Sequence, residues 1–243
     1  NPIRNFDPNG EDVYILFYTI GNERGVNQFE ASAQTRKEEI ESGKSYDPDK
    51  DKVIMFGVSD ISDVGALSEW AVETYSEQYG QTAEVGVWSH AGLDGPVGTE
   101  AASKSPLNEG SKQMSMEGWG NINFNWKESG SNLSFYGCNT GKDVNNGEWV
   151  GSFARNVSKL DNMKGVDVWG QSTSAYPSTN PYFRESSLSR SAGVFIGPTY
   201  MVGGNAGEGE KSMWFNPFST YPPANRMNVY RRGRLIRSAY QNR

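Results

Sequence analysis

Apolar residues of this chain gather in five short runs, separated by longer polar segments. The runs are four to eight residues long and rich in β-branched and aromatic side chains. This pattern is typical of strands that are buried on both faces of a sheet. The predicted strands cover residues 13–20, 53–58, 85–89, 133–136 and 166–169.

The segments between these runs carry helical periodicity. A polar helix is expected over 26–42, ended by Gly43, and a second from Asp63, which can cap it, to about residue 79. The third, over 148–160, has the clearest apolar face. Residues 119–126 are expected to form a short helix or an irregular stretch.

Strands that alternate with helices predict an α/β domain whose mainly parallel sheet is covered on both faces. The rest of the chain is rich in glycine, proline and polar residues, with 28 glycines in 243 residues. We expect long loops over 91–118 and 171–192, a small hairpin over 194–202 and an irregular C-terminal extension over 203–243.

Charge and hydropathy narrow the classes of partner. The net charge is -6, and six arginines follow residue 225 without any acid, so residues 1–225 carry -12. An acidic body argues against nucleic acid as a partner. We expect the arginine-rich tail to be solvated or to pack on its own acidic body. The longest apolar run has eight residues, too few to span a membrane as a helix.

The chain contains a single cysteine, Cys138, and a single histidine, His90. This composition excludes an internal disulfide framework and zinc sites built on several cysteines or histidines. Each residue directly follows a predicted strand, and parallel strands bring their carboxyl ends to one edge of the sheet. We therefore expect the thiol and the imidazole to lie close together at this edge.

A cysteine and a histidine in this arrangement suit nucleophilic catalysis. The histidine can activate the thiol and protonate a leaving amine. Backbone N–H groups of Cys138 and of Ala91 or Gly92 can bind an oxyanion, and neighbouring glycines allow a substrate backbone to approach. This chemistry requires no metal and no cofactor.

The order and spacing of these residues resemble the caspase-like cysteine peptidases. His90 and Cys138 are separated by 48 positions, and a group of caspase-like domains in bacterial surface proteins shares further blocks. The matching blocks are Ser89-His90-Ala91-Gly92, Trp119-Gly120, Tyr136-Gly137-Cys138-Asn139 and Gly147-Glu148-Trp149-Val150. The resemblance covers about residues 12–176 and implies a three-layer α/β/α sandwich, with a catalytic domain over 11–202. It also implies a cysteine endopeptidase that acts on proteins.

Two features of the resemblance bear on the substrate site. The family usually has glycine after the histidine, where this chain has Ala91, whose Cβ affects the oxyanion geometry. Relatives with an acidic pocket select lysine or arginine, so Asp94 and Asp143 suggest a basic preference. Residues 172–176, with Ser172 and Ser174, could line a groove for an extended substrate.

The first ten residues, NPIRNFDPNG, resemble the end of an Rhs/YD-repeat core. The domain that follows such a core is a delivered toxin, so the resemblance implies secretion, entry into a target cell and a cognate immunity protein. The chain starts at Asn1, and we expect it to be a fragment of a longer protein. A reducing target cytosol would keep a catalytic thiol free.

Two alternatives remain open. Arg24, Ser172-Thr173-Ser174 and Glu208-Gly209-Glu210 resemble the motifs of ADP-ribosyltransferase toxins, although strand–helix alternation fits that fold poorly. The second alternative is an inactive caspase-like module that only binds, which Ala91 would favour. Loss of activity in Arg24→Ala together with intact activity in Cys138→Ala would favour the first, and failure of a thiol probe to label native Cys138 would favour the second.

Overall fold

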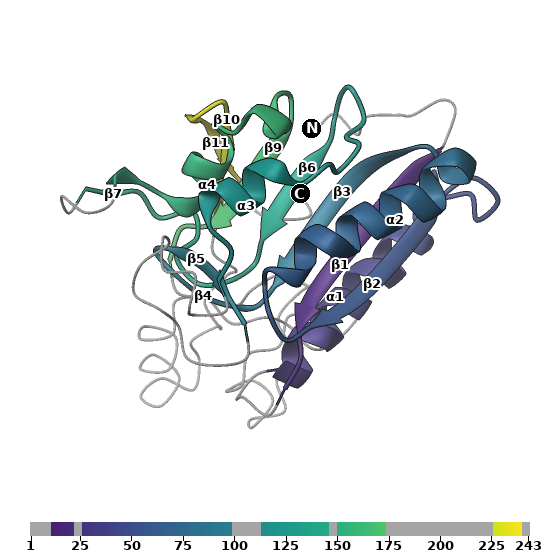
Figure 1. Cartoon of the computed structure of the whole chain (residues 1–243), viewed down its shortest axis with the longest axis horizontal. Coiled ribbons are helices and arrows are strands. Elements are labelled where there is room, and N and C mark those ends of the chain that lie inside the picture. Colours follow the sequence, from purple (N-terminus) through teal and green to yellow (C-terminus); the bar gives the residue numbers. More distant parts are fainter. Residues whose placement is uncertain (1–10, 22–25, 99–112, 146–149, 174–225, 240–243) are drawn as a thin grey trace, which may run out of the picture.

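A seven-stranded sheet forms the centre of the molecule (Figure 1). The computed structural model describes residues 11–21, 26–98, 113–145, 150–173 and 226–239. The strand order is β11-β10-β9-β6-β3-β1-β2.

Five of the strands run parallel to one another. They are β1 (Asp12–Thr19), β2 (Lys52–Val58), β3 (Gln81–Trp88), β6 (Asn132–Phe135) and β9 (Asp167–Gln171). All five correspond to the apolar runs of the sequence. The predicted mainly parallel sheet is therefore confirmed.

Helices cover both faces of this sheet. On one face, α1 (Val26–Glu41) packs Phe29, Ala33 and Ile40 against β1 and β2. The opposite face is covered by α2 (Asp63–Tyr79), α3 (Met116–Asn121) and α4 (Phe153–Val157). Figure 1 shows α1 and α2 on opposite sides of β1 and β2. Two separate apolar clusters result, and the expected three-layer α/β/α architecture is confirmed.

The helix expected over 148–160 is shorter than its apolar periodicity suggested. Residues Val150–Gly151 form strand β8, which pairs with β7 (Val144–Asn145), and α4 starts only at Phe153. Gly151 has a φ of 89°, which no helix accommodates. Ser152 then caps α4 by accepting a hydrogen bond from the Arg155 N–H. Residues 146–149 lie outside the described part.

Two segments expected to be irregular contain hairpins. The first lies within the loop expected over 91–118 and pairs β4 (His90–Gly92) with β5 (Gly95–Val97). The second is formed by β10 (Met227–Arg231) and β11 (Arg234–Ala239), and β10 adds antiparallel to β9. Part of the expected C-terminal extension thus belongs to the central sheet.

The remaining elements complete the described chain. A 3₁₀ helix, η2 (Asp161–Met163), connects α4 to β9. The expected hairpin over 194–202, the boundary at residue 202 and the Rhs-like residues 1–10 lie outside the described residues. Among the helices that are described, none combines the length and apolarity needed to cross a membrane.

Candidate active site

His90 and Cys138 follow two neighbouring strands at the same level. β3 and β6 pair in parallel with Val87 opposite Phe135, an offset of 48 residues. The same offset separates His90 from Cys138. Both residues therefore lie three positions beyond a pair of facing residues. Neighbouring strands are about 4.8 Å apart, so the register brings the two strand ends side by side.

The turns that carry the two residues are in direct contact. A Cβ built on Gly137 would lie 2.4 Å from the Ala91 Cβ and 2.9 Å from the Ser89 carbonyl oxygen. Any side chain at residue 137 would separate the turns, because the facing atoms belong to backbone or to a short side chain. Glycine next to the thiol thus allows the cysteine turn to reach the residues that flank His90.

Aromatic side chains lie next to both turns. Trp88 and Tyr136 lie two positions before His90 and Cys138, and their rings stack with centroids 4.2 Å apart. The His90 ring meets Phe29 of α1 edge to face, with centroids 5.0 Å apart. The imidazole itself is exposed, and Cys138 is half-buried. Both side chains therefore keep solvent-accessible surface, while buried rings precede them in their strands.

The segment 138–143, which we name the thiol loop, is hydrogen-bonded to the end of β9 and the residues after it. Asn139 adopts a φ of 61°, a left-handed conformation that asparagine tolerates. Its N–H donates to the Thr173 carbonyl at 3.0 Å, and the Gly141 N–H donates to the Gln171 carbonyl at 2.8 Å. The buried Thr140 hydroxyl donates to the Gly137 carbonyl at 3.0 Å. These bonds fix the backbone immediately after the thiol.

The expected oxyanion donors lie around the same contact. The Ala91 nitrogen lies 3.3 Å from the position of a Gly137 Cβ, so it borders the cysteine turn. Ala91 faces Pro96, which has no N–H, across the β4–β5 pair. Gly92 is restricted by Asp94, whose Oδ1 would be 2.5 Å from a Cβ at residue 92. The contact between the two turns thus places Ala91 next to Gly137, the residue before Cys138.

The two aspartates expected to select a basic substrate have different surroundings. Burial raises the pKa of the Asp94 carboxyl, while a hydrogen bond from the Asp94 backbone counters part of this effect. The Asp94 Oδ2 is buried and has no hydrogen-bond partner among the residues that the structure describes. In contrast, Asp143 pairs with the Arg155 guanidinium at 2.7 Å. Asp94 is therefore the better candidate for binding a substrate cation, because the charge of Asp143 is already matched.

Residues after β9 border the thiol loop as well. Ser172 donates to the Arg226 carbonyl at 2.7 Å, and the Thr173 carbonyl receives the Asn139 N–H. Ser174 and the other residues of the ADP-ribosyltransferase-like motifs, Arg24, Glu208 and Glu210, lie outside the described residues.

Sequence reasoning missed three residues that surround the thiol loop. Gln171 is fully buried beside Thr140, and within the described part of the chain neither its amide oxygen nor its side-chain nitrogen has a hydrogen-bond partner. Asn228 and Tyr230, on β10, donate hydrogen bonds to the Gly141 carbonyl. No local pattern in the sequence signals these contacts, because Gln171 lies 31 residues from Thr140 and the two β10 residues lie more than 80 residues from Gly141.

Within the described ranges, no group of three or more histidine, cysteine, aspartate or glutamate residues could hold a metal ion. The fold and the two reactive residues together define the class of protein. It is a three-layer α/β/α domain with a thiol and an imidazole on adjacent turns at the carboxyl edge of its sheet.

Comparison with known proteins gives one solved structure to report. It is the X-ray structure of a secreted C11 cysteine protease from Bacteroides thetaiotaomicron in complex with an irreversible peptide inhibitor. The two chains are 13% identical and align with a TM-score of 0.48 over 92% of this chain and 66% of that one. This chain thus spans just under two thirds of the protease's length. No protein-family model and no curated protein matches the sequence.

Proposed function

We propose that this chain is a cysteine endopeptidase in which Cys138 is the nucleophile and His90 the acid and base. The contact between Gly137 and Ala91 carries the proposal, since it joins the turns of the sole thiol and the sole imidazole. The shared offset of 48 residues supports the proposal. Two unrelated residues after neighbouring strands would have no reason to lie at the same height along the sheet.

The reaction follows from the chemistry of these groups. The Cys138 sulfur attacks the carbonyl carbon of a peptide bond, and a C–S bond forms while the carbonyl oxygen gains negative charge. The N–H groups of Cys138 and of Ala91 or Gly92 bind this oxyanion. His90 gives the proton that it took from the Cys138 thiol to the leaving nitrogen as the C–N bond breaks. His90 then takes a proton from the water that attacks the thioester. When the C–S bond breaks, this proton passes to the sulfur and restores the thiol.

The substrate preference of this site is proposed to be basic, with Asp94 as the acceptor of the cation. Its unpartnered Oδ2 supports this role. We expect peptides with lysine or arginine before the cleaved bond to be preferred, and Asp94→Asn to reduce kcat/KM for these peptides but not for neutral ones. Ser172 and Ser174 would lie along the rest of the substrate.

The biological role proposed for the enzyme is that of a toxin delivered into a target cell. It rests on the resemblance of residues 1–10 to the end of an Rhs/YD-repeat core. The substrates are then proteins of the target cell, and a producing cell would need an immunity protein against the enzyme. Production of the chain inside a bacterium tests this role, because Cys138→Ala should remove toxicity.

The decisive experiment for the activity is cleavage of a peptide library by the wild type, Cys138→Ala and His90→Ala. Cleavage by the wild type alone supports the proposal, provided that all three proteins have similar melting temperatures. Full activity of Cys138→Ala would exclude thiol catalysis. Absence of cleavage in the wild type, together with binding of a target protein, would favour a caspase-like binding module.

A further inference from the structure

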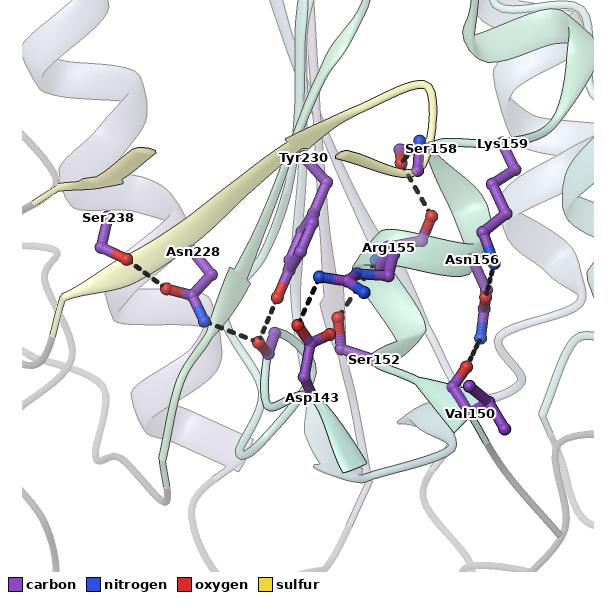
Figure 2. A network of polar contacts seen from close by, with 12 residues as sticks. Asp143, Val150, Ser152, Arg155, Asn156, Ser158, Lys159, Asn228, Tyr230 and Ser238 are labelled. Carbon is purple, nitrogen blue, oxygen red and sulfur yellow. Dashed lines mark hydrogen bonds and ion pairs between the residues drawn. The ribbon is translucent and has the colours of Figure 1, made fainter. Parts of the chain in front are cut away.

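The thiol loop is held from outside by the C-terminal hairpin. The Gly141 carbonyl oxygen accepts two hydrogen bonds, from the Asn228 side-chain amide and from the Tyr230 hydroxyl, each 2.9 Å long. Both donors belong to β10, and Figure 2 shows them converging on the loop that carries Asp143. A carbonyl oxygen has two lone pairs, so both acceptor positions are occupied.

Gly141 is fixed on its other sides as well. Its N–H donates to Gln171, and a Cβ at this residue would lie 2.2 Å from the Gly170 carbonyl oxygen. The Gly141 backbone therefore packs directly on β9 while β10 holds its carbonyl. The β9 contacts and the β10 donors thus act together on Gly141.

Hydrogen bonds connect Gly141 back to the thiol. The Lys142 N–H donates to the Asn139 carbonyl at 2.9 Å, which closes a turn over Thr140 and Gly141. The Thr140 hydroxyl in turn holds the Gly137 carbonyl. Every residue from 139 to 142 is thus bonded within the loop or to β9. A displacement of Gly141 would therefore act on Asn139, the residue next to Cys138.

The two donors are themselves oriented. Tyr230 is fully buried, and burial raises the pKa of its hydroxyl, which keeps the group protonated and able to donate. The Arg155 guanidinium lies over its ring at 5.3 Å and pairs with Asp143 at the end of the loop. The Asn228 amide oxygen accepts from Ser238, which directs the nitrogen toward Gly141.

From these contacts we infer that Asn228 and Tyr230 are positioning residues for Cys138. They hold the Gly141 carbonyl and thereby set the place of the thiol relative to His90. The role rests on the proposed peptidase function, and it makes the C-terminal hairpin a required part of the site. Neither residue touches the reacting atoms.

Tyr230→Phe, Asn228→Ala and the double variant test this role. Each single variant leaves one donor on the carbonyl, so kcat should fall only about 3- to 10-fold, the effect of one hydrogen bond. The double variant leaves a buried acceptor unsatisfied, and kcat should fall by more than about 100-fold, beyond the product of the single effects. KM should stay within about twofold, since substrate contacts are unchanged. Backbone amide hydrogen exchange over residues 138–142 should accelerate in the double variant.

Tyr14→Phe is the matched control. It also removes a tyrosine hydroxyl from the sheet, but Tyr14 lies near the start of β1 and contacts Asp12. It should leave kcat and the exchange of the thiol loop unchanged. All assays are run well below the melting temperature of each variant.

The outcomes separate this inference from the proposed function. Unchanged exchange in the double variant overturns the inference, and so does faster exchange with unchanged kcat. If the wild type cleaves no peptide, the proposed function fails, and the rate of Cys138 alkylation by iodoacetamide replaces kcat as the readout. A changed alkylation rate in the double variant then supports the positioning role of Asn228 and Tyr230, and an unchanged rate overturns it.

Discussion

Single glycines decide how closely the two reactive turns approach. Gly137 contacts the Ala91 Cβ and the Ser89 carbonyl, and neither atom can move without its backbone. The sequence predicted the thiol and the imidazole at this edge because each follows an apolar run. It could not predict Tyr230 or Asn228, since their contacts depend on how β10 pairs with β9.

Gly137→Ala should separate the turns of Cys138 and His90. We expect kcat/KM for peptide cleavage to fall about 100-fold, as a displacement near 1 Å can cause. Overpacking should also cost about 1–3 kcal/mol in the free energy of unfolding. The control is Gly65→Ala in α2, where a Cβ would meet only Ile122 at 3.6 Å. That variant should retain activity, and equal activity of both would contradict the role of the contact.

Asp94 should make stability depend on pH. Its pKa is raised above 3.8 by burial, so the folded state keeps the proton to higher pH than the unfolded state. The resulting stability is present below this value and is lost as pH rises. Asp94→Asn has no carboxyl proton to lose. Its melting temperature should therefore rise relative to that of the wild type as pH increases from about 3 to 7. A constant difference across this range would contradict the effect of burial.

The observed boundaries of helices and strands differ most from the predicted ones where the conformation of a single residue ends the regular element. The apolar face over 148–160 indicated one long helix, but Gly151 in a left-handed conformation and the cap at Ser152 start α4 later. The hairpin of β10 and β11 did have a local signal. Arg232 and Gly233, both with positive φ, form a two-residue turn of the kind that glycine favours.

Ser152→Ala tests the element boundary. The serine is buried and caps α4 through the Arg155 N–H, so its loss should cost about 1 kcal/mol in chemical denaturation. Ser62 precedes α2 but makes no side-chain cap. Ser62→Ala should therefore change stability by less than about 0.5 kcal/mol. Equal effects of the two variants would show that the α4 cap is not a distinct contribution.

Across the whole molecule, the arginine-rich C-terminal segment completes the sheet of an acidic body. Arg231 and Arg237 both pair with Asp167 of β9, at 2.6 and 3.3 Å. The sequence indicated that this tail would be solvated or pack on its own protein, and these pairs agree with packing. It did not reveal the pairing partner, which lies about 65 residues away in the chain.

Asp167→Asn should loosen the hairpin. Two arginines would lose a nearly buried carboxylate, and trypsin should cut at Arg231 or Arg232 several-fold faster. The control is Asp161→Asn, because Asp161 pairs only with Lys164 at an exposed position. Tryptic peptides identified by mass give the rates. Unchanged cleavage in Asp167→Asn would mean that the ion pairs do not hold β10 and β11 in place.

Labelling of Cys138 by a peptide-based covalent probe tests the central claim most directly. The probe carries a weak leaving group beside a lysine, and its reaction rate is followed by intact mass in the wild type and in His90→Ala. A histidine that assists proton transfer is worth about 10²–10⁴-fold. We predict that His90→Ala is labelled at least 100-fold more slowly, while iodoacetamide still modifies Cys138 in both proteins. Equal probe rates in the two proteins would contradict a shared site of thiol and imidazole.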